Sequence, residues 1–112
     1  MLVIALGDIY AQIPHLEAVR ELMRETQEQA RARPGCVSYS FAETLDDPGH
    51  FVMAQEWRDQ ASLEEPYRSE TYADFQNKLE LLLVHSSDLR IYLVQEPLRP
   101  IESVGDNPQF DE

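Results

Sequence analysis

The chain has few of the residue types on which several classes of protein depend. Its 112 residues include a single cysteine, Cys36, so neither an intrachain disulfide nor a cysteine-based zinc site can form. This cysteine usage favours a reducing, cytoplasmic location. The apolar N-terminal run reaches an acid at Asp8 and has no basic flank, so it predicts a strand rather than a signal segment or a membrane span.

Positive charge is also scarce. Nine Lys+Arg stand against 21 Asp+Glu, and the formal net charge is −12. Such a field repels phosphate backbones and anionic lipid surfaces, so we expect no nucleic-acid partner and no membrane partner. Neither G-x-G-x-x-G nor G-x-x-x-x-G-K-[ST] occurs in the chain, so nucleotide and flavin binding have no support.

The length bounds the architecture. A chain of 112 residues makes one domain and leaves no room for a separate cofactor module. On folding it hides roughly 65% of its unfolded surface, enough for one core but not for a core and a large enclosed cleft. We therefore expect any sizeable site to need help from a partner subunit.

Hydrophobic periodicity predicts the elements. The aliphatic run over residues 2–11 predicts a strand buried on both faces, and helical spacing of apolar residues predicts helices over 14–33 and 69–84. Pro34-Gly35 ends the first of these helices and Ser69 caps the second. Asp59 is a candidate cap for a short helical segment that Pro66 must end or kink.

Alternation of side chains predicts the remaining strands, over 36–44, 51–57 and 89–96. In the first of them Val37, Tyr39 and Phe41 share one face. The resulting order β-α-β-β-α-β predicts an α+β, ferredoxin-like fold, with one antiparallel sheet and two helices on one face. We expect this domain to span residues 1–96, and residues 97–112 to form a tail that is an arm on a partner or is disordered.

The predicted strands carry apolar side chains on both faces, so a single chain would expose a large apolar patch on the uncovered face of the sheet. We expect the chain to cover this face by forming a homodimer.

Several short motifs together resemble the antibiotic biosynthesis monooxygenase (ABM) family. They are the segments Arg33-Pro34-Gly35-Cys36-Val37-Ser38-Tyr39, Asp46-Asp47-Pro48, Phe51-Val52 and Glu56-Trp57-Arg58-Asp59, followed by Leu63 and Ser69. The likeness covers residues 2 to about 96. It implies a ferredoxin-like protomer paired into a dimeric α+β barrel, with a pocket between helices and sheet. Relatives include cofactor-independent monooxygenases of quinols or polycyclic phenols, haem-degrading monooxygenases and degraders of small signalling molecules.

The chain departs from the family pattern at three places. Pro66 and Thr71 stand where many members carry histidines. The haem-degrading branch uses a histidine of the second helix as an iron ligand, and residues 69–84 contain none, the nearest being His85. The resemblance therefore disfavours haem chemistry.

The aromatic candidates are expected to contact the substrate, and Trp57 is also expected to be a catalytic residue. The resemblance would place Trp57 in the pocket, where its indole N–H could donate to a substrate oxygen, although a core tryptophan is the alternative. Tyr residues could position or deprotonate a phenol, or they could simply pack. These candidates are Tyr39, Tyr72, Tyr92 and Tyr10, and Phe75 joins Tyr39, Tyr72 and Tyr92 as expected substrate-binding residues.

Arg90, Asp8 and His85 are the ionisable candidates for catalysis. Arg90 could stabilise a phenolate, or it could form a salt bridge in a dimer. Burial could raise the pKa of Asp8 towards a general-base role, or Asp8 could pair with an arginine. The three histidines, His15, His50 and His85, are too scattered for a metal site, and we expect them at the surface; His85 is the second candidate for the proton acceptor. Cys36 has no nearby basic partner and is not expected to be a nucleophile.

These expectations combine into one leading hypothesis. The chain is a homodimeric, cofactor-independent and metal-independent monooxygenase that oxidises a quinol or polycyclic phenol with dioxygen. The proton acceptor would be Asp8 or His85. The first alternative is a non-catalytic dimeric protein that carries or senses an apolar ligand in the same pocket, and the second is a structural dimer whose barrel is filled.

Overall fold

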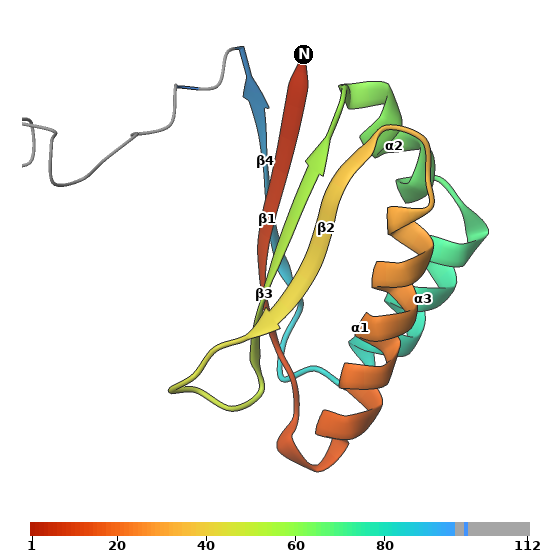
Figure 1. Ribbon diagram of the computed structural model, residues 1–112. Coiled ribbons are helices and arrows are strands. Elements are labelled where there is room, and N and C mark those ends of the chain that lie inside the picture. Colours follow the sequence, from red (N-terminus) through yellow and green to blue (C-terminus); the bar gives the residue numbers. More distant parts are fainter. Residues whose placement is uncertain (96–97, 99–112) are drawn as a thin grey trace, which may run out of the picture.

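The computed structural model describes residues 1–95 and residue 98. Four antiparallel strands form a single sheet, and the helices lie together on one of its faces (Figure 1). In chain order the elements are β1 (Leu2–Tyr10), the 3-10 helix η1 (Ile13–His15), α1 (Leu16–Arg31), β2 (Cys36–Glu43), β3 (His50–Trp57), α2 (Gln60–Tyr67), α3 (Glu70–Glu80) and β4 (Asp88–Val94).

The strand order β2-β3-β1-β4 is that of the ferredoxin-like fold. β1 lies at the centre and pairs antiparallel with β3 on one side and β4 on the other. β2 pairs with β3 at the opposite edge. The α+β fold predicted from the order of elements is confirmed, with α2 as a short additional helix. The predicted tail over residues 97–112 lies outside the described residues, except for residue 98.

The prediction that both faces of the first strand are buried is wrong for the single chain. Burial alternates along β1: Val3, Ala5, Gly7 and Ile9 are buried beneath the helices, and the residues between them are only half-buried. The reason is that all helices cover the same face (Figure 1).

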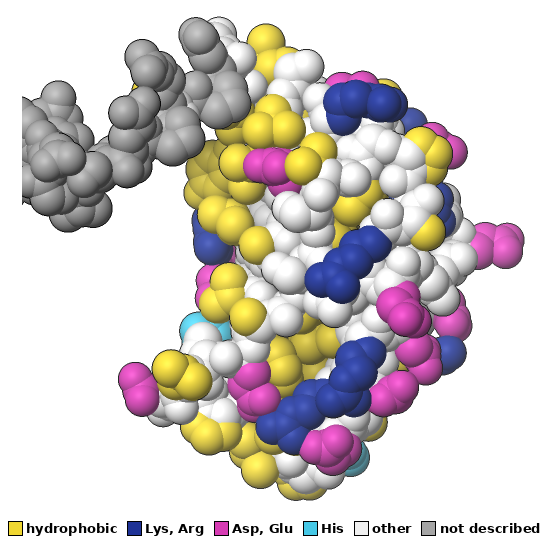
Figure 2. Space-filling model, in the orientation of Figure 1, with side chains coloured by type: hydrophobic (Ala, Val, Ile, Leu, Met, Phe, Trp, Pro, Cys, Tyr) yellow, Lys and Arg dark blue, Asp and Glu magenta, His cyan; other side chains and the backbone are white. Residues whose placement is uncertain are grey.

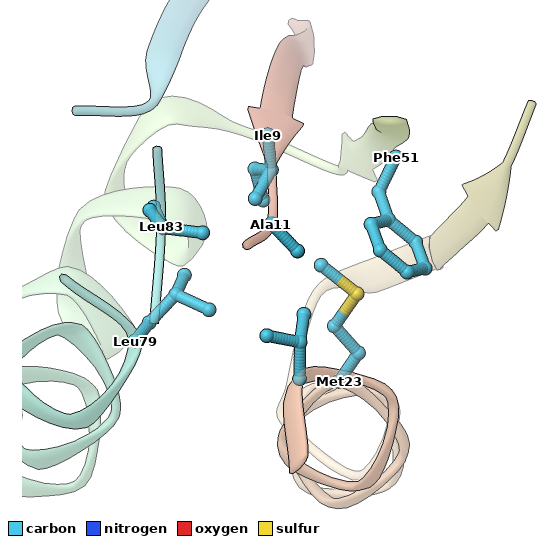
Figure 3. Packing of buried hydrophobic residues seen from close by; sticks show 7 residues of the cluster. Ile9, Ala11, Met23, Phe51, Leu79 and Leu83 are labelled. Atoms are coloured by element: carbon cyan, nitrogen blue, oxygen red, sulfur yellow. The ribbon is translucent and has the colours of Figure 1, made fainter. Parts of the chain in front are cut away.

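The core consists of two clusters at opposite ends of the sheet. Figure 3 shows the first. It comprises Ile9 of β1, Ala11 just after it, Val19 and Met23 of α1, Phe51 of β3, Leu79 of α3 and Leu83 in the segment that follows α3. The second surrounds Trp57 and comprises Val3, Ala5, Ala30, Tyr39, Trp57 and Leu63. The first cluster joins both long helices to the sheet, and the second contains the aromatic residues of the site described below.

Both predicted long helices are too long. α3 ends at Glu80 because the chain then turns back to the sheet, where Ala11 bridges to Leu83 and the Val84 N–H donates to the Tyr10 carbonyl at 2.8 Å. The Gln12 side chain also donates to the Leu83 carbonyl at 2.7 Å. These tertiary hydrogen bonds outweigh the helical spacing of the leucines.

The helix caps are confirmed. Asp59 accepts a hydrogen bond from the Ser62 N–H at 2.8 Å at the start of α2, and Ser69 accepts from the Tyr72 N–H at 3.2 Å at the start of α3. Pro66 lies in the last turn of α2, which ends one residue later.

The alternation predicted for the second strand is wrong at its start. An irregularity between Cys36 and Ser38 sets Cys36 opposite Trp57, on the helix-covered face with Tyr39. Val37 is left exposed. One extra residue in one strand shifts the faces of all residues before it, and side-chain pattern alone does not reveal it.

The face of the sheet that carries no helix, here called the open face, combines apolar side chains with an ionic cluster. The pairing registers place on it Leu2, Ile4, Leu6, Asp8 and Tyr10 of β1, Ser38, Ser40 and Ala42 of β2, His50, Val52, Ala54 and Glu56 of β3, and Asp88, Arg90, Tyr92 and Val94 of β4. Figure 2 shows hydrophobic side chains gathered along the sheet side of the molecule. Within the described residues no helix is long and apolar enough to cross a membrane.

Candidate functional site

A pocket lies between the helices and the covered face of the sheet. α1 and the α2–α3 junction form its walls, and β2 and β3 form its floor. Its volume is about 60 Å³. The lining residues are Thr26, Gln29, Ala30, Arg33, Tyr39, Gln55, Trp57, Pro66, Tyr67, Ser69, Thr71, Tyr72 and Phe75.

The local structure explains why these side chains converge. Thr26, Gln29, Ala30 and Arg33 follow the i, i+3, i+4, i+7 spacing, so α1 and its C-terminal extension present one face to the pocket. The floor comes from cross-strand neighbours, because Tyr39 of β2 stands opposite Gln55 of β3. The floor residues are buried, so the pocket is closed at the sheet. Gln29 and Thr71 are exposed, so the pocket is open between the helices.

Gln55 is the centre of a polar network in the floor. Its side chain is 2% exposed, its Oε1 accepts a hydrogen bond from Trp57 Nε1 at 2.9 Å, and its Nε2 donates to the Tyr67 hydroxyl at 3.1 Å. Nε2 also lies 3.1 Å from Met53 Sδ. The sequence reading did not single out Gln55 or Tyr67. The signal that could have identified Gln55 is its place as the one polar residue among the alternating side chains Phe51, Met53, Gln55 and Trp57.

The aromatic rings pack edge to face around this network. The centroids of Tyr67 and Tyr72 lie 4.4 Å apart at an interplanar angle of 78°. Tyr39 stands at 82° to Trp57 with 6.4 Å between centroids, and Tyr72 stacks with Phe75 at 6.3 Å. Such pairs stabilise a rigid aromatic wall, against which a flat ligand can pack.

The tyrosines of the pocket are hydrogen-bond donors at neutral pH. Burial is the main cause that raises the pKa of Tyr39, Tyr72 and Tyr67 above the ordinary value of 10.0. None of them can therefore serve as a base near pH 7. Because Gln55 donates to the Tyr67 oxygen, the Tyr67 O–H is directed to another acceptor.

The structure brings together four of the predicted site residues and separates the others. Trp57, Tyr39, Tyr72 and Phe75 line one pocket. The register of β4 places Arg90 and Tyr92 on the open face, with Asp8 of β1, on the opposite side of the sheet. His85 follows α3, and its ring lies 5.0 Å from that of Tyr10. Trp57 Nε1 is already bonded to Gln55, so in this arrangement it does not donate to a ligand.

Asp8 belongs to a separate ionic cluster on the open face. Its Oδ1 lies 2.8 Å from His50 Nε2, and its Oδ2 lies 3.3 Å from the Arg90 guanidinium, which also pairs with Asp88 at 2.6 Å. Tyr10 stacks on His50 at 4.4 Å. The expectation that His50 is a plain surface residue is wrong, because its side chain is 18% exposed and bonded.

The expectation that burial raises the pKa of Asp8 is also wrong. The hydrogen bond from His50 is the largest influence, and together with Arg90 it lowers the pKa of this carboxyl below its ordinary value of 3.8 despite partial desolvation. In the single chain Asp8 is thus an ion-paired carboxylate, as in the alternative that it pairs with an arginine.

Lowering the pH should remove a stabilising contribution of Asp8. Because its folded pKa is depressed, this contribution is fully present above pH 3.8 and is lost as the pH falls through the folded pKa. The difference in free energy of unfolding between the wild type and Asp8→Asn should therefore be largest near pH 7 and shrink below pH 3.8. Urea denaturation at a series of pH values measures it.

The exposed Asp46→Asn variant controls for the removal of one negative charge in this titration. Asp46 lies in the loop between β2 and β3 and has no ion pair among the described residues. A difference between wild type and Asp8→Asn that stays constant from pH 7 to pH 2 would contradict the ion-paired state of Asp8.

No group of three or more His, Cys, Asp or Glu side chains within residues 1–95 is arranged to hold a metal ion. Cys36 is partly buried, and desolvation raises the pKa of its thiol. A raised pKa disfavours the thiolate that a nucleophile requires.

Comparisons with known proteins support one family. The family model described as Antibiotic biosynthesis monooxygenase matches residues 2–78. The uncharacterized protein sll1783 of Synechocystis sp. is 28% identical over 94 residues, which are 84% of this chain and 64% of that relative. The chain thus spans less than two thirds of the relative's length.

Solved structures agree in fold. Rv0793 from Mycobacterium tuberculosis matches with a TM-score of 0.76 and 22% identity, over 93% of this chain and 99% of its own. A Deinococcus radiodurans protein assigned provisionally to the same family gives a TM-score of 0.83 and 22% identity, over 88% and 98% of the two chains. At these identities the likeness establishes the fold.

Proposed function

Because the chain belongs to the antibiotic biosynthesis monooxygenase family, we propose that it is a monooxygenase that oxidises a quinol or a polycyclic phenol with dioxygen and without a resident cofactor. The observation that carries this proposal is the pocket of Trp57, Tyr39, Tyr72 and Phe75, whose aromatic walls suit a flat ring. Its small volume favours a ligand that inserts one ring and leaves the remainder in the mouth between the helices.

The reaction balances with the substrate as its own reductant. A quinol and dioxygen give a hydroxyquinone and water: one oxygen atom enters the ring, and the other takes up two hydrogens and leaves as water. The first step is loss of a phenolic proton, after which the electron-rich phenolate can reduce dioxygen. The protein must therefore bind the ring, exclude water and stabilise the anion.

The residues of the pocket have separate roles in this reaction. Trp57 and Tyr72 hold the ring, and the hydroxyls of Tyr67 and Tyr72 donate to its oxygen as negative charge develops. No carboxylate and no histidine of the described residues lines the pocket, so an acidic phenol must ionise to solvent at the open mouth. The catalytic roles expected for Asp8, Arg90 and His85 would require a contribution from the open face of a partner. We propose a structural role for Asp8 and Arg90, which pair with each other within one chain at 3.3 Å.

A homodimer is part of the proposal. The open face places Leu2, Ile4 and Leu6 beside Tyr92 and Val94, and Tyr92 is 47% exposed in the single chain. An apolar sheet face of this extent is stabilised by a second copy of itself, which a two-fold axis would align. Sedimentation equilibrium should give twice the chain mass of 12.9 kDa.

A non-catalytic carrier is the second candidate function. It is favoured by the absence of a carboxylate and a histidine from the pocket lining, and by the engagement of Trp57 Nε1 with Gln55. A carrier would use the same aromatic walls to bind a flat ligand and would leave it unchanged.

Oxygen uptake with a panel of hydroquinone and polycyclic quinols tests the two candidates. A monooxygenase should consume one dioxygen per quinol, and Trp57→Phe should lower turnover about tenfold because the ring wall becomes smaller. The exposed Lys78→Gln variant of α3 is the control. Quenching of Trp57 fluorescence without oxygen consumption would indicate the carrier, and neither quenching nor consumption would contradict both candidates.

A further inference from the structure

Arg33 differs from the other cations of the described chain. Arg20, Arg24, Arg58, Arg68, Lys78 and Arg90 each pair with a carboxylate, and Arg31 donates to the Tyr39 carbonyl at 2.9 Å. Within residues 1–95 the Arg33 guanidinium has neither an ion pair nor a side-chain hydrogen bond, and it lines the aromatic pocket. An arginine without a partner is notable in a chain with 21 Asp+Glu.

Among the described residues, no acid lines the pocket beside Arg33, although the formal net charge of the chain is −12. Several acids adjoin lining residues in the sequence without lining the pocket themselves; they are Glu25, Glu28, Glu56, Glu65, Glu70 and Asp74. An anionic ligand in the pocket can therefore bind the Arg33 guanidinium without competition from a carboxylate of the lining.

The remaining polar groups point to the same ligand chemistry. The hydroxyls of Tyr39, Tyr67 and Tyr72 stay protonated at neutral pH and can act as hydrogen-bond donors. The carbonyl oxygen of Gln55 already accepts a hydrogen bond from Trp57. The tyrosine hydroxyls and the Arg33 guanidinium thus provide donors for a ligand with oxygen acceptors.

We propose that the pocket selects anionic aromatic ligands, with the ring against Trp57, Tyr72 and Phe75 and a carboxylate bound by Arg33 at the mouth. The inference rests on the proposed function and narrows its substrate class to quinols that carry an acidic substituent. The guanidinium fork matches a carboxylate in two parallel hydrogen bonds, which fixes the orientation of the ring as well as its charge.

The position of Arg33 also permits a structural role. It follows the C-terminus of α1 by two residues, where a cation interacts favourably with the helix carbonyls. A role limited to helix stability would leave the choice between a charged and an uncharged ligand unchanged, so a ligand comparison separates the two roles.

The test compares 2,5-dihydroxybenzoate with its methyl ester, and hydroxynaphthoate with its methyl ester, by calorimetric titration at physiological salt. In each pair the ring and size are nearly equal, and only the charge differs. The overall negative field of the protein disfavours the acid, so a preference for it requires a local cation. The wild type should bind the acid at least about tenfold more tightly than the ester.

Arg33→Gln should abolish this preference, and Arg33→Lys should retain part of it. Arg24→Gln is the matched control, because it removes one positive charge from the exposed side of α1 and should keep the preference. Equal binding of acid and ester, or a preference that survives Arg33→Gln, would overturn the inference and leave the quinol function intact. Binding of neither pair would also overturn it, while oxygen uptake with uncharged quinols judges the proposed function separately.

Discussion

Replacing Trp57 with alanine should lower the free energy of unfolding by about 3–5 kcal/mol. The side chain is 1% exposed and packs in the cluster with Val3, Ala30 and Leu63. Removing the indole ring leaves a cavity. It also leaves Oε1 of the buried Gln55 without its hydrogen-bond donor. The loss is a large fraction of the roughly 5–15 kcal/mol that stabilises a typical domain.

Urea denaturation followed by circular dichroism measures this loss, because the variant has no tryptophan fluorescence. Trp57→Phe is the matched control. It keeps most of the ring but removes the indole N–H, so it should cost about 1–3 kcal/mol, mainly through the unpaired Gln55 oxygen. Adding Gln55→Leu to Trp57→Phe should recover part of that cost. A loss below about 1 kcal/mol for Trp57→Ala would contradict the packing seen here.

Replacing Gly35 with alanine should cost about 3 kcal/mol, for two separable reasons. Gly35 has φ of +81°, a conformation that L side chains rarely adopt. A Cβ atom at this position would also lie 2.5 Å from Ser62 Cβ of α2 and collide with the Ser62 hydroxyl. The turn that precedes β2 therefore approaches Ser62 of α2 too closely for any side chain at Gly35.

Gly49→Ala is the matched control for the cost of placing a side chain at a positive φ. Gly49 has φ of +87°, but its Cβ would lie 3.1 Å from the nearest atoms, the Ala11 carbonyl oxygen and Ile13 Cδ1. We expect it to cost about 1–2 kcal/mol, less than Gly35→Ala. Combining Gly35→Ala with Ser62→Gly should recover the excess, as chemical denaturation of Gly35→Ala, Gly49→Ala, Ser62→Gly and the double variant would show. Equal losses for Gly35→Ala and Gly49→Ala would contradict the close approach to Ser62.

The candidate site was predictable in part. Trp57, Tyr39, Tyr72 and Phe75 were predicted as contact residues, and they line one pocket. Asp8 and Arg90 were also predicted, but they lie across the sheet and pair with each other. Alternation along a strand says which residues share a face, but it does not say which face the helices cover. A residue of an apolar strand can thus be assigned to either side.

The roles of Gln55 and Arg33 in the pocket were not predicted from the sequence. Gln55 occupies a core position, where its cost of burial is offset by Trp57, two residues further along β3, and by Tyr67 of α2, which the sequence pattern does not connect to it. Arg33 stands beside the glycine turn that carried the family resemblance, and it becomes distinctive only when its lack of a carboxylate partner in the described chain is known. Partner identity is a tertiary property.

The sequence by itself determined the order of elements, the ferredoxin-like fold, the family and the caps at Asp59 and Ser69. The order of elements, the fold and the caps follow from local periodicity, from turn residues and from side chains that bond to a backbone a few residues away, whereas the family follows from the motifs that resemble it. The tertiary structure decided where α3 ends, the displacement of Val37, the separation of Asp8 from the pocket and the isolation of Arg33. Each of these depends on hydrogen bonds, charges or packing between segments distant in the chain, whose free energies outweigh the weak local preferences that a sequence displays.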